Sequence, residues 1–70
     1  MSGLKKRSVQ LAGHATSIAL EPEFWSVLQA MAQSRSTTLA ALLVEIDEGR
    51  GERPLASACR LAALSFASGA

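Results

Sequence analysis

The sequence predicts a small, mainly α-helical domain in which a short β-ribbon precedes the helices. Three observations point to this class. Apolar residues alternate with polar or small ones through residues 7–20, which is typical of strands with one buried face. Apolar residues then recur at helical spacing in later segments, and Pro, Gly or a polar turn separates those segments. The chain has 70 residues, which is the size of one domain. We expect that domain over residues 7–67, between a flexible basic arm (1–6) and a frayed tail (68–70).

The ribbon is expected to bend at Gly13, because glycine within a strand pattern marks a turn or a sharp bend. The pattern leaves two pairings open. Residues 7–12 can fold back on residues 14–20 within one chain, or the strand can pair with its copy in a second chain. A lone strand would leave an open edge, and pairing with a second copy removes it. We therefore expect an intertwined homodimer.

The first helix is expected to begin at Pro22, since proline lacks the N–H that has no partner at the first helical position. It should stop around residues 33–34, where a polar turn begins. The next helix follows that turn, with Thr37 or Thr38 as its N-cap, because a hydroxyl there accepts a hydrogen bond from a free amide. It should end at residues 47–49.

A third helix is expected to begin at Pro54 and is apolar over much of its circumference. Such a helix needs more cover than one small protomer provides, which again favours a second copy. The apolar positions of the ribbon and the first two helices are predicted to form the dimer core: Ile18, Leu20, Phe24, Trp25, Leu28, Leu39, Leu42, Leu43 and Ile46.

The composition argues against several classes of protein. No run of about 18 apolar residues occurs, so no membrane span is expected. No apolar segment follows the basic start, as a signal peptide would require, and we expect a cytoplasmic protein. One cysteine, Cys59, and one histidine, His14, are too few for a zinc cage, and they fall on different elements. We therefore expect no metal, no cofactor, no catalytic residue and no enzymatic activity.

Charge is distributed unevenly along the chain. The formal net charge is +1, but Lys5, Lys6 and Arg7 are the only charged residues among the first 20. The six acidic residues all fall within residues 21–53. A basic arm of this kind can contact a polyanion, although a solubilising tail would have the same composition.

Several short motifs, taken together, carry a resemblance over about residues 6–66. They are Lys6-Arg7-Ser8-Val9, Ala12-Gly13-His14, Ser17-Ile18-Ala19-Leu20-Glu21-Pro22-Glu23-Phe24-Trp25, Leu39-Ala40-Ala41-Leu42, Glu45-Ile46-Asp47 and Leu55-Ala56-Ser57-Ala58-Cys59-Arg60-Leu61. In this combination the chain resembles a family of short bacterial ribbon-helix-helix proteins. The resemblance implies a ribbon-helix-helix fold with an additional C-terminal helix. In the wider superfamily, which includes the Arc and methionine repressors, two chains pair their strands into a ribbon that enters the major groove of DNA.

The resemblance implies that outward side chains of the ribbon touch base edges while the start of the second helix meets a phosphate. Ala15 and Ala19 offer base edges only methyl groups, so the polar residues of the ribbon and of the basic arm are the better readers. Free amides at the start of a helix favour anions. The expected DNA contacts are Lys5, Lys6, Arg7, Ser8, Gln10, Ser17, Arg35, Ser36, Thr37 and Thr38.

The sequence thus predicts a homodimeric, sequence-specific DNA-binding protein, a small transcriptional regulator whose partners are a second copy and double-stranded DNA. The near-neutral net charge and the alanines on the ribbon favour an alternative. In that alternative the dimer is a protein–protein interaction module, antitoxin-like or an adaptor, that binds a larger protein partner without DNA.

Overall fold

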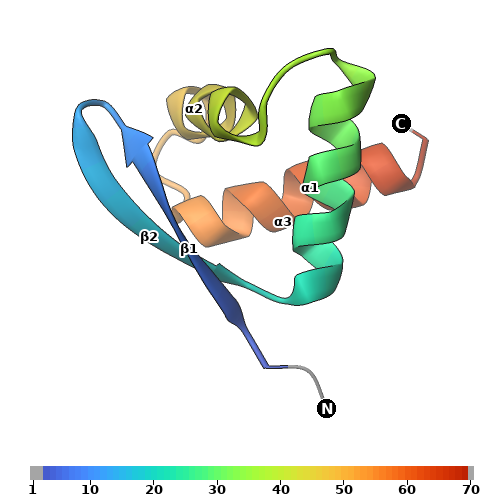
Figure 1. Ribbon diagram of the computed structural model, residues 1–70, viewed down its shortest axis with the longest axis horizontal. Coiled ribbons are helices and arrows are strands. Elements are labelled where there is room, and N and C mark those ends of the chain that lie inside the picture. The colour runs from blue at the N-terminus through green and yellow to red at the C-terminus, as the bar shows by residue number, and fades with distance from the viewer. Residues whose placement is uncertain (1–2, 70) are drawn as a thin grey trace.

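The computed structural model describes residues 3–69, and it confirms a ribbon followed by three helices (Figure 1). The elements in chain order are β1 (Lys5–Leu11), β2 (His14–Leu20), α1 (Pro22–Ser34), α2 (Leu39–Gly49) and α3 (Leu55–Ala67). The predicted start of α1 at Pro22 and the predicted cap of α2 at Thr38 are confirmed, and α3 begins at Leu55, one residue after the predicted Pro54. Residues 1–2 of the expected basic arm and residue 70 of the expected tail lie outside the described residues.

The ribbon is an antiparallel hairpin within the one chain, in which Arg7 lies opposite Ile18 and Leu11 lies opposite His14. Its turn is Ala12-Gly13, with φ of 51° and 82°, the positive values that a type I′ turn requires. The backbone twist of this turn matches that of paired strands, so the chain closes on itself. The premise that the strand lacks a partner in its own chain is therefore wrong. Because β1 begins at Lys5, two residues expected in the arm belong to the ribbon.

The turn allows a direct test, because Ala12 holds a left-handed conformation that costs an alanine about 1–2 kcal/mol. Asparagine tolerates this conformation far better and is common in type I′ turns. Ala12→Asn is therefore expected to raise the free energy of unfolding by about 0.5–1 kcal/mol. Thermal unfolding followed by circular dichroism would show this as an increase in Tm of a few degrees. An unchanged or lower Tm would contradict the turn geometry.

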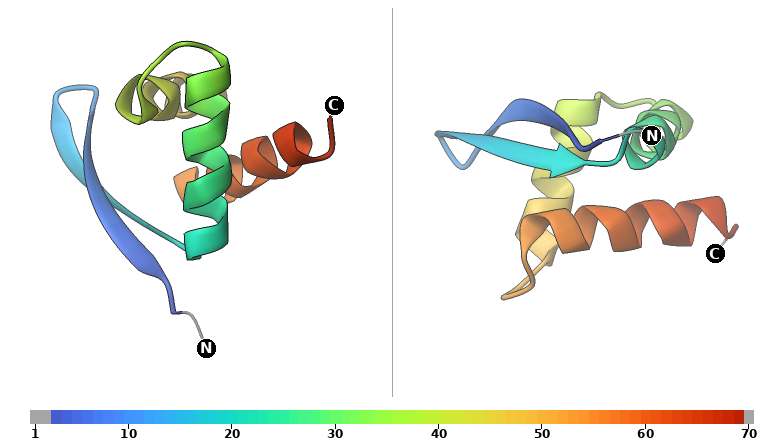
Figure 2. Two further views of the ribbon diagram at one scale, coloured as in Figure 1. Left: turned by 45° about the vertical axis from the view of Figure 1, so that its right-hand side comes forward. Right: turned by 90° about the horizontal axis from the view of Figure 1, so that it is seen from below.

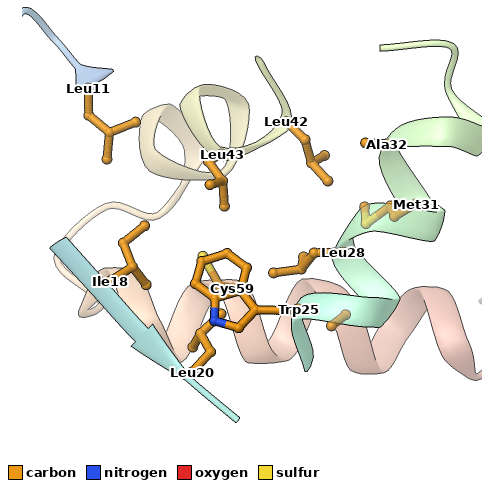
Figure 3. Packing of buried hydrophobic residues seen from close by; sticks show 11 residues of the cluster. Leu11, Ile18, Leu20, Trp25, Leu28, Met31, Ala32, Leu42, Leu43 and Cys59 are labelled. Carbon is orange, nitrogen blue, oxygen red and sulfur yellow. The ribbon is translucent and has the colours of Figure 1, made fainter. Parts of the chain in front are cut away.

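One hydrophobic core lies between the hairpin and the helices (Figure 3). Leu20, Leu28, Leu42, Leu43 and Cys59 have no exposed surface at all. Of the residues predicted for a dimer core, six are buried within this single chain and three are partly buried against its core. The buried six are Ile18, Leu20, Trp25, Leu28, Leu42 and Leu43, and the partly buried three are Phe24, Leu39 and Ile46.

Helix α3 supplies much of the cover that the sequence suggested a second chain would give. It contacts α1, α2 and β2, and it buries Ala58, Cys59 and Ala63. The right-hand view of Figure 2 places β2 between β1 and α3. Two of its leucines are not covered: Leu61 is 46% exposed and Leu64 is 58% exposed. The excess apolar surface expected of this helix is thus confined to its outer side.

Arg60 fastens α3 to the start of α1. Its Nε donates to Glu21 Oε1 at 3.0 Å, and its guanidinium carbon lies 5.9 Å from the centre of the Phe24 ring. Hydrogen bonds from the backbone amide of Glu21 and from Arg60 lower the pKa of the Glu21 carboxyl. The carboxylate therefore stays ionised next to the arginine over a wider pH range than an isolated glutamate would.

Candidate nucleic-acid interface

The hairpin has two faces of different character, because successive side chains in a strand point to opposite sides. Ile18 and Leu20, which were expected to point inward, are 3% and 0% exposed and face the helices. Their neighbours in the alternation point the other way. In register, the outward pairs are Lys6 with Ala19, Ser8 with Ser17, and Gln10 with Ala15.

This outward face, which we call the reading face, carries the polar side chains of Lys6, Ser8, Gln10 and Ser17, all of them exposed. The two serines lie directly opposite each other at its centre. A glutamine amide can make paired hydrogen bonds to adenine, serine can bond to any base edge, and lysine can contact phosphate. Three of these four side chains belong to β1. The hairpin therefore presents more polar groups on this face than β2 alone would.

The structure places the three consecutive basic residues Lys5, Lys6 and Arg7 on different faces of the hairpin. Lys6 lies on the reading face, whereas Lys5 and Arg7 share the alternation of Val9 and Leu11 and lie on the helix side. The Arg7 guanidinium carbon is 5.3 Å from the centre of the Trp25 ring. Trp25 Nε1 donates to the backbone oxygen of Lys5 at 2.8 Å. These contacts hold the start of β1 against α1.

The turn between α1 and α2 contains the second group of predicted contacts. Thr38 is confirmed as the N-cap, since its Oγ1 accepts from the Ala41 amide at 3.0 Å. Ser36 has a φ of 54°, and its amide donates to the Gln33 oxygen at 3.0 Å. The Thr37 amide donates to the Ala32 oxygen at 2.9 Å. The amides of Ser36 and Thr37 are thus already used to close α1.

The amides of Leu39 and Ala40, in the first turn of α2, are available to an anion, and neither residue was among the predicted contacts. Neither has a hydrogen-bond partner in the described part of the chain, as is usual in the first turn of a helix. Their position directly after the cap was the signal that could have identified them. The hydroxyls of Ser36, Thr37 and Thr38 stand at the same end of α2.

Arg35 lies beside this helix end but is paired with Glu45, at 3.1 Å between Nη1 and Oε1. Both side chains are about half exposed or more, at 49% and 64%. An exposed pair of this kind contributes only about 0–1 kcal/mol, so a phosphate can take the place of Glu45 at small cost.

Two further residues, Cys59 and His14, were considered as reactive or metal-binding groups in the sequence. Burial raises the pKa of the Cys59 thiol to about 11, so the thiol is protonated at neutral pH and is a poor nucleophile. His14 lies exposed at the far end of the hairpin. Among residues 3–69, no group of three metal-ligating side chains comes together, and no helix is long and apolar enough to cross a membrane.

Comparisons with known proteins agree with this architecture. The solved structure of an uncharacterized protein from Bordetella pertussis Tohama I is similar over 96% of this chain, with a TM-score of 0.85 and 29% sequence identity. The match covers 58% of that longer chain. No curated protein matches the sequence. The model of the ribbon-helix-helix domain, a family of DNA-binding regulators that typically dimerise, matches residues 4–67. Since that match runs from β1 through α3, the chain belongs to the ribbon-helix-helix domain family.

Proposed function

We propose that the protein is a DNA-binding transcriptional regulator that inserts its hairpin into the major groove. The observation that carries this proposal is the reading face, on which one cation, one amide and two hydroxyls share an exposed side of a two-stranded ribbon. A ribbon of two strands fits the width of the major groove, and its outward side chains then reach base edges. Such a regulator acts in the cytoplasm, on the cell's own DNA.

In the proposed complex each polar group has a distinct role. Gln10 and the two serines Ser8 and Ser17 contact base edges, and Lys6 contacts the backbone at the edge of the groove. The free amides of Leu39 and Ala40, with the hydroxyls of the preceding turn, bind a flanking phosphate at the positive end of the α2 dipole. Arg35 releases Glu45 and joins this phosphate.

We further propose that the protein acts as a homodimer. A two-stranded hairpin leaves unpaired backbone groups along its outer edges, and a second copy can cover one of them. Phe24, Leu39 and Ile46 keep part of their surface exposed and are the predicted dimer-core residues with area left to bury. Two copies double the reading face, so the operator is expected to be a pseudo-palindrome.

Fluorescence anisotropy with genomic and random duplexes, at several salt concentrations, tests this function. Lys6→Gln removes about one phosphate contact per chain, and the slope of log affinity against log salt is expected to fall by about 0.9 for each phosphate that is no longer neutralised. Arg53→Gln is the matched control, because Arg53 is exposed in the α2–α3 loop and its replacement changes the charge equally. Absence of binding at tens of micromolar protein in low salt would contradict the proposal, as would equal reductions of affinity in both variants.

A second function is favoured by one observation, the exposed Leu61 and Leu64 on the outer side of α3. They lie about one helical turn apart, as an apolar contact for a larger protein partner would require. In this alternative the dimer binds that partner without DNA. Its binding would depend little on salt and would be abolished in the double variant Leu61→Ala, Leu64→Ala, whereas DNA binding would survive that change.

A further inference from the structure

A groove lies between β1 and α1, on the side of the hairpin opposite the reading face. It has a volume of about 410 Å³, which falls within the range of small-molecule binding sites. We call it the β1–α1 groove. The side chains of interest along it are those of Lys5, Arg7, Trp25, Ser26, Gln29 and Gln33.

The strand wall of the β1–α1 groove is cationic. Lys5 and Arg7 both line it, and none of its lining residues in the described part of the chain carries a carboxylate. Within residues 3–69 neither cation has an ion-pair partner. The Arg7 guanidinium instead lies over the Trp25 ring, and its N–H groups make no hydrogen bond among the described residues, so they remain free to donate to a ligand. The structure thus holds an unpaired arginine in place beside an unpaired lysine.

The helix wall of the groove is neutral and polar. Ser26, Gln29 and Gln33 follow one another at spacings of three and four residues, so they share one face of α1. All three are exposed, and none makes a side-chain hydrogen bond in the described part of the chain. Ala30, between them, has a small side chain that leaves room. This wall offers donors and acceptors to the hydroxyl groups of a ligand.

We propose that the β1–α1 groove binds a small phosphorylated ligand that also carries hydroxyl groups. Arg7 and Lys5 bind the phosphate, because a guanidinium fork beside a lysine suits an anion with several oxygens. Ser26, Gln29 and Gln33 bind the hydroxyls. The ligand does not stack on Trp25, since Arg7 covers that ring and the backbone oxygen of Lys5 already accepts from its Nε1. This site stands apart from the proposed DNA contacts and does not depend on them.

Trp25 is the only tryptophan in the sequence and lies directly under Arg7, so it reports on the groove. The full chain is titrated with inorganic phosphate and with glycerol 3-phosphate, at constant ionic strength set by sodium chloride. The indole N–H resonance and the tryptophan emission are followed. Both probes are expected to give saturable changes, and glycerol 3-phosphate is expected to bind several-fold more tightly than inorganic phosphate.

Two neighbouring residues provide a matched pair of variants. Arg7→Gln is expected to weaken phosphate binding at least about fivefold, because it removes charge-assisted hydrogen bonds to the anion. Lys6→Gln removes the same charge one residue away but from the reading face, so it is expected to leave phosphate binding unchanged within about twofold. Lys5→Gln, which keeps the contact between Arg7 and Trp25, is expected to weaken phosphate binding without disturbing packing. Gln29→Leu is expected to remove the preference for glycerol 3-phosphate.

Three results would overturn this proposal. The first is the absence of saturable changes with both probes, and the second is an equal weakening in Lys6→Gln and Arg7→Gln, which would mean diffuse attraction to a basic surface. The third comes from duplex DNA, which is the other source of phosphate. Arg7→Gln is expected to keep duplex affinity within about threefold, because Arg7 lies on the helix side. A decrease as large as that of Lys6→Gln would assign the groove to the DNA backbone instead of a small ligand.

Discussion

Leu28→Ala is expected to lower the free energy of unfolding by about 2–5 kcal/mol. Leu28 lies on α1, has no exposed surface, and points into the middle of the core in Figure 3. Its replacement removes apolar area from the core and leaves a cavity that the surrounding backbone cannot fully close. In a domain of this size about 1 kcal/mol corresponds to about 4–8 °C in Tm, so a decrease of about 10 °C or more is expected in thermal unfolding.

Leu64→Ala is the control for this variant. The substitution is chemically the same and also lies in a helix, but Leu64 is 58% exposed on α3. We expect a change within about 0.5 kcal/mol, because surface substitutions rarely exceed that. If Leu28→Ala were as mild as Leu64→Ala, the single-chain core described above would be wrong. A large effect of Leu64→Ala that grows with protein concentration would instead indicate that a second copy covers this residue.

Trp25→Ala is the second change for which we expect a large effect, a decrease of about 3–5 kcal/mol in the free energy of unfolding. The indole is 4% exposed, lies under Arg7, and ties α1 to β1 through its hydrogen bond to the Lys5 oxygen. Trp25→Phe keeps most of the buried area but removes the N–H donor. It should therefore cost only about 1–2 kcal/mol, the usual effect of removing one hydrogen bond.

Urea unfolding of these two variants separates packing from hydrogen bonding at Trp25. Amide hydrogen exchange adds a local test, since Trp25→Phe is expected to weaken protection mostly at the start of β1, where Lys5 is no longer tied to the helix. Protection that falls evenly over the whole chain would contradict a local fastening role. Equal destabilisation by the alanine and the phenylalanine would mean that the hydrogen bond, and not the buried ring, holds α1 to the hairpin.

The helix boundaries could be predicted because local chemistry sets them. Pro22 fits the first turn of α1, the Thr38 hydroxyl accepts a hydrogen bond from the Ala41 amide of α2, and Pro54 precedes α3. Each acts through backbone groups within a few residues, so the sequence contains the full signal. The inward positions Ile18 and Leu20 were predictable for a similar reason, because strand alternation is also a local property.

The start of β1 and the orientation of the basic residues were harder to predict. The inward positions there are Lys5 and Arg7, which an alternation of apolar and polar residues does not reveal. Arg7 lies on the helix side, where its guanidinium lies over Trp25, a residue of the following helix and not of the ribbon. Pairing within the chain was also hard to choose, since Ala12 is not a residue that usually marks a type I′ turn. These features depend on contacts between distant residues, which one sequence does not display.

The two-residue turn at Ala12-Gly13 also bears on how the protein reaches its native state. A ribbon made from two separate chains forms only when they meet, so its rate depends on concentration. Here the strands are neighbours along the polypeptide, and hairpins of this kind close in about 1–10 μs. The ribbon can therefore form on a single nascent chain before any helix is complete. Refolding from urea, followed by tryptophan fluorescence, should accordingly begin with a phase whose rate is the same at every dilution.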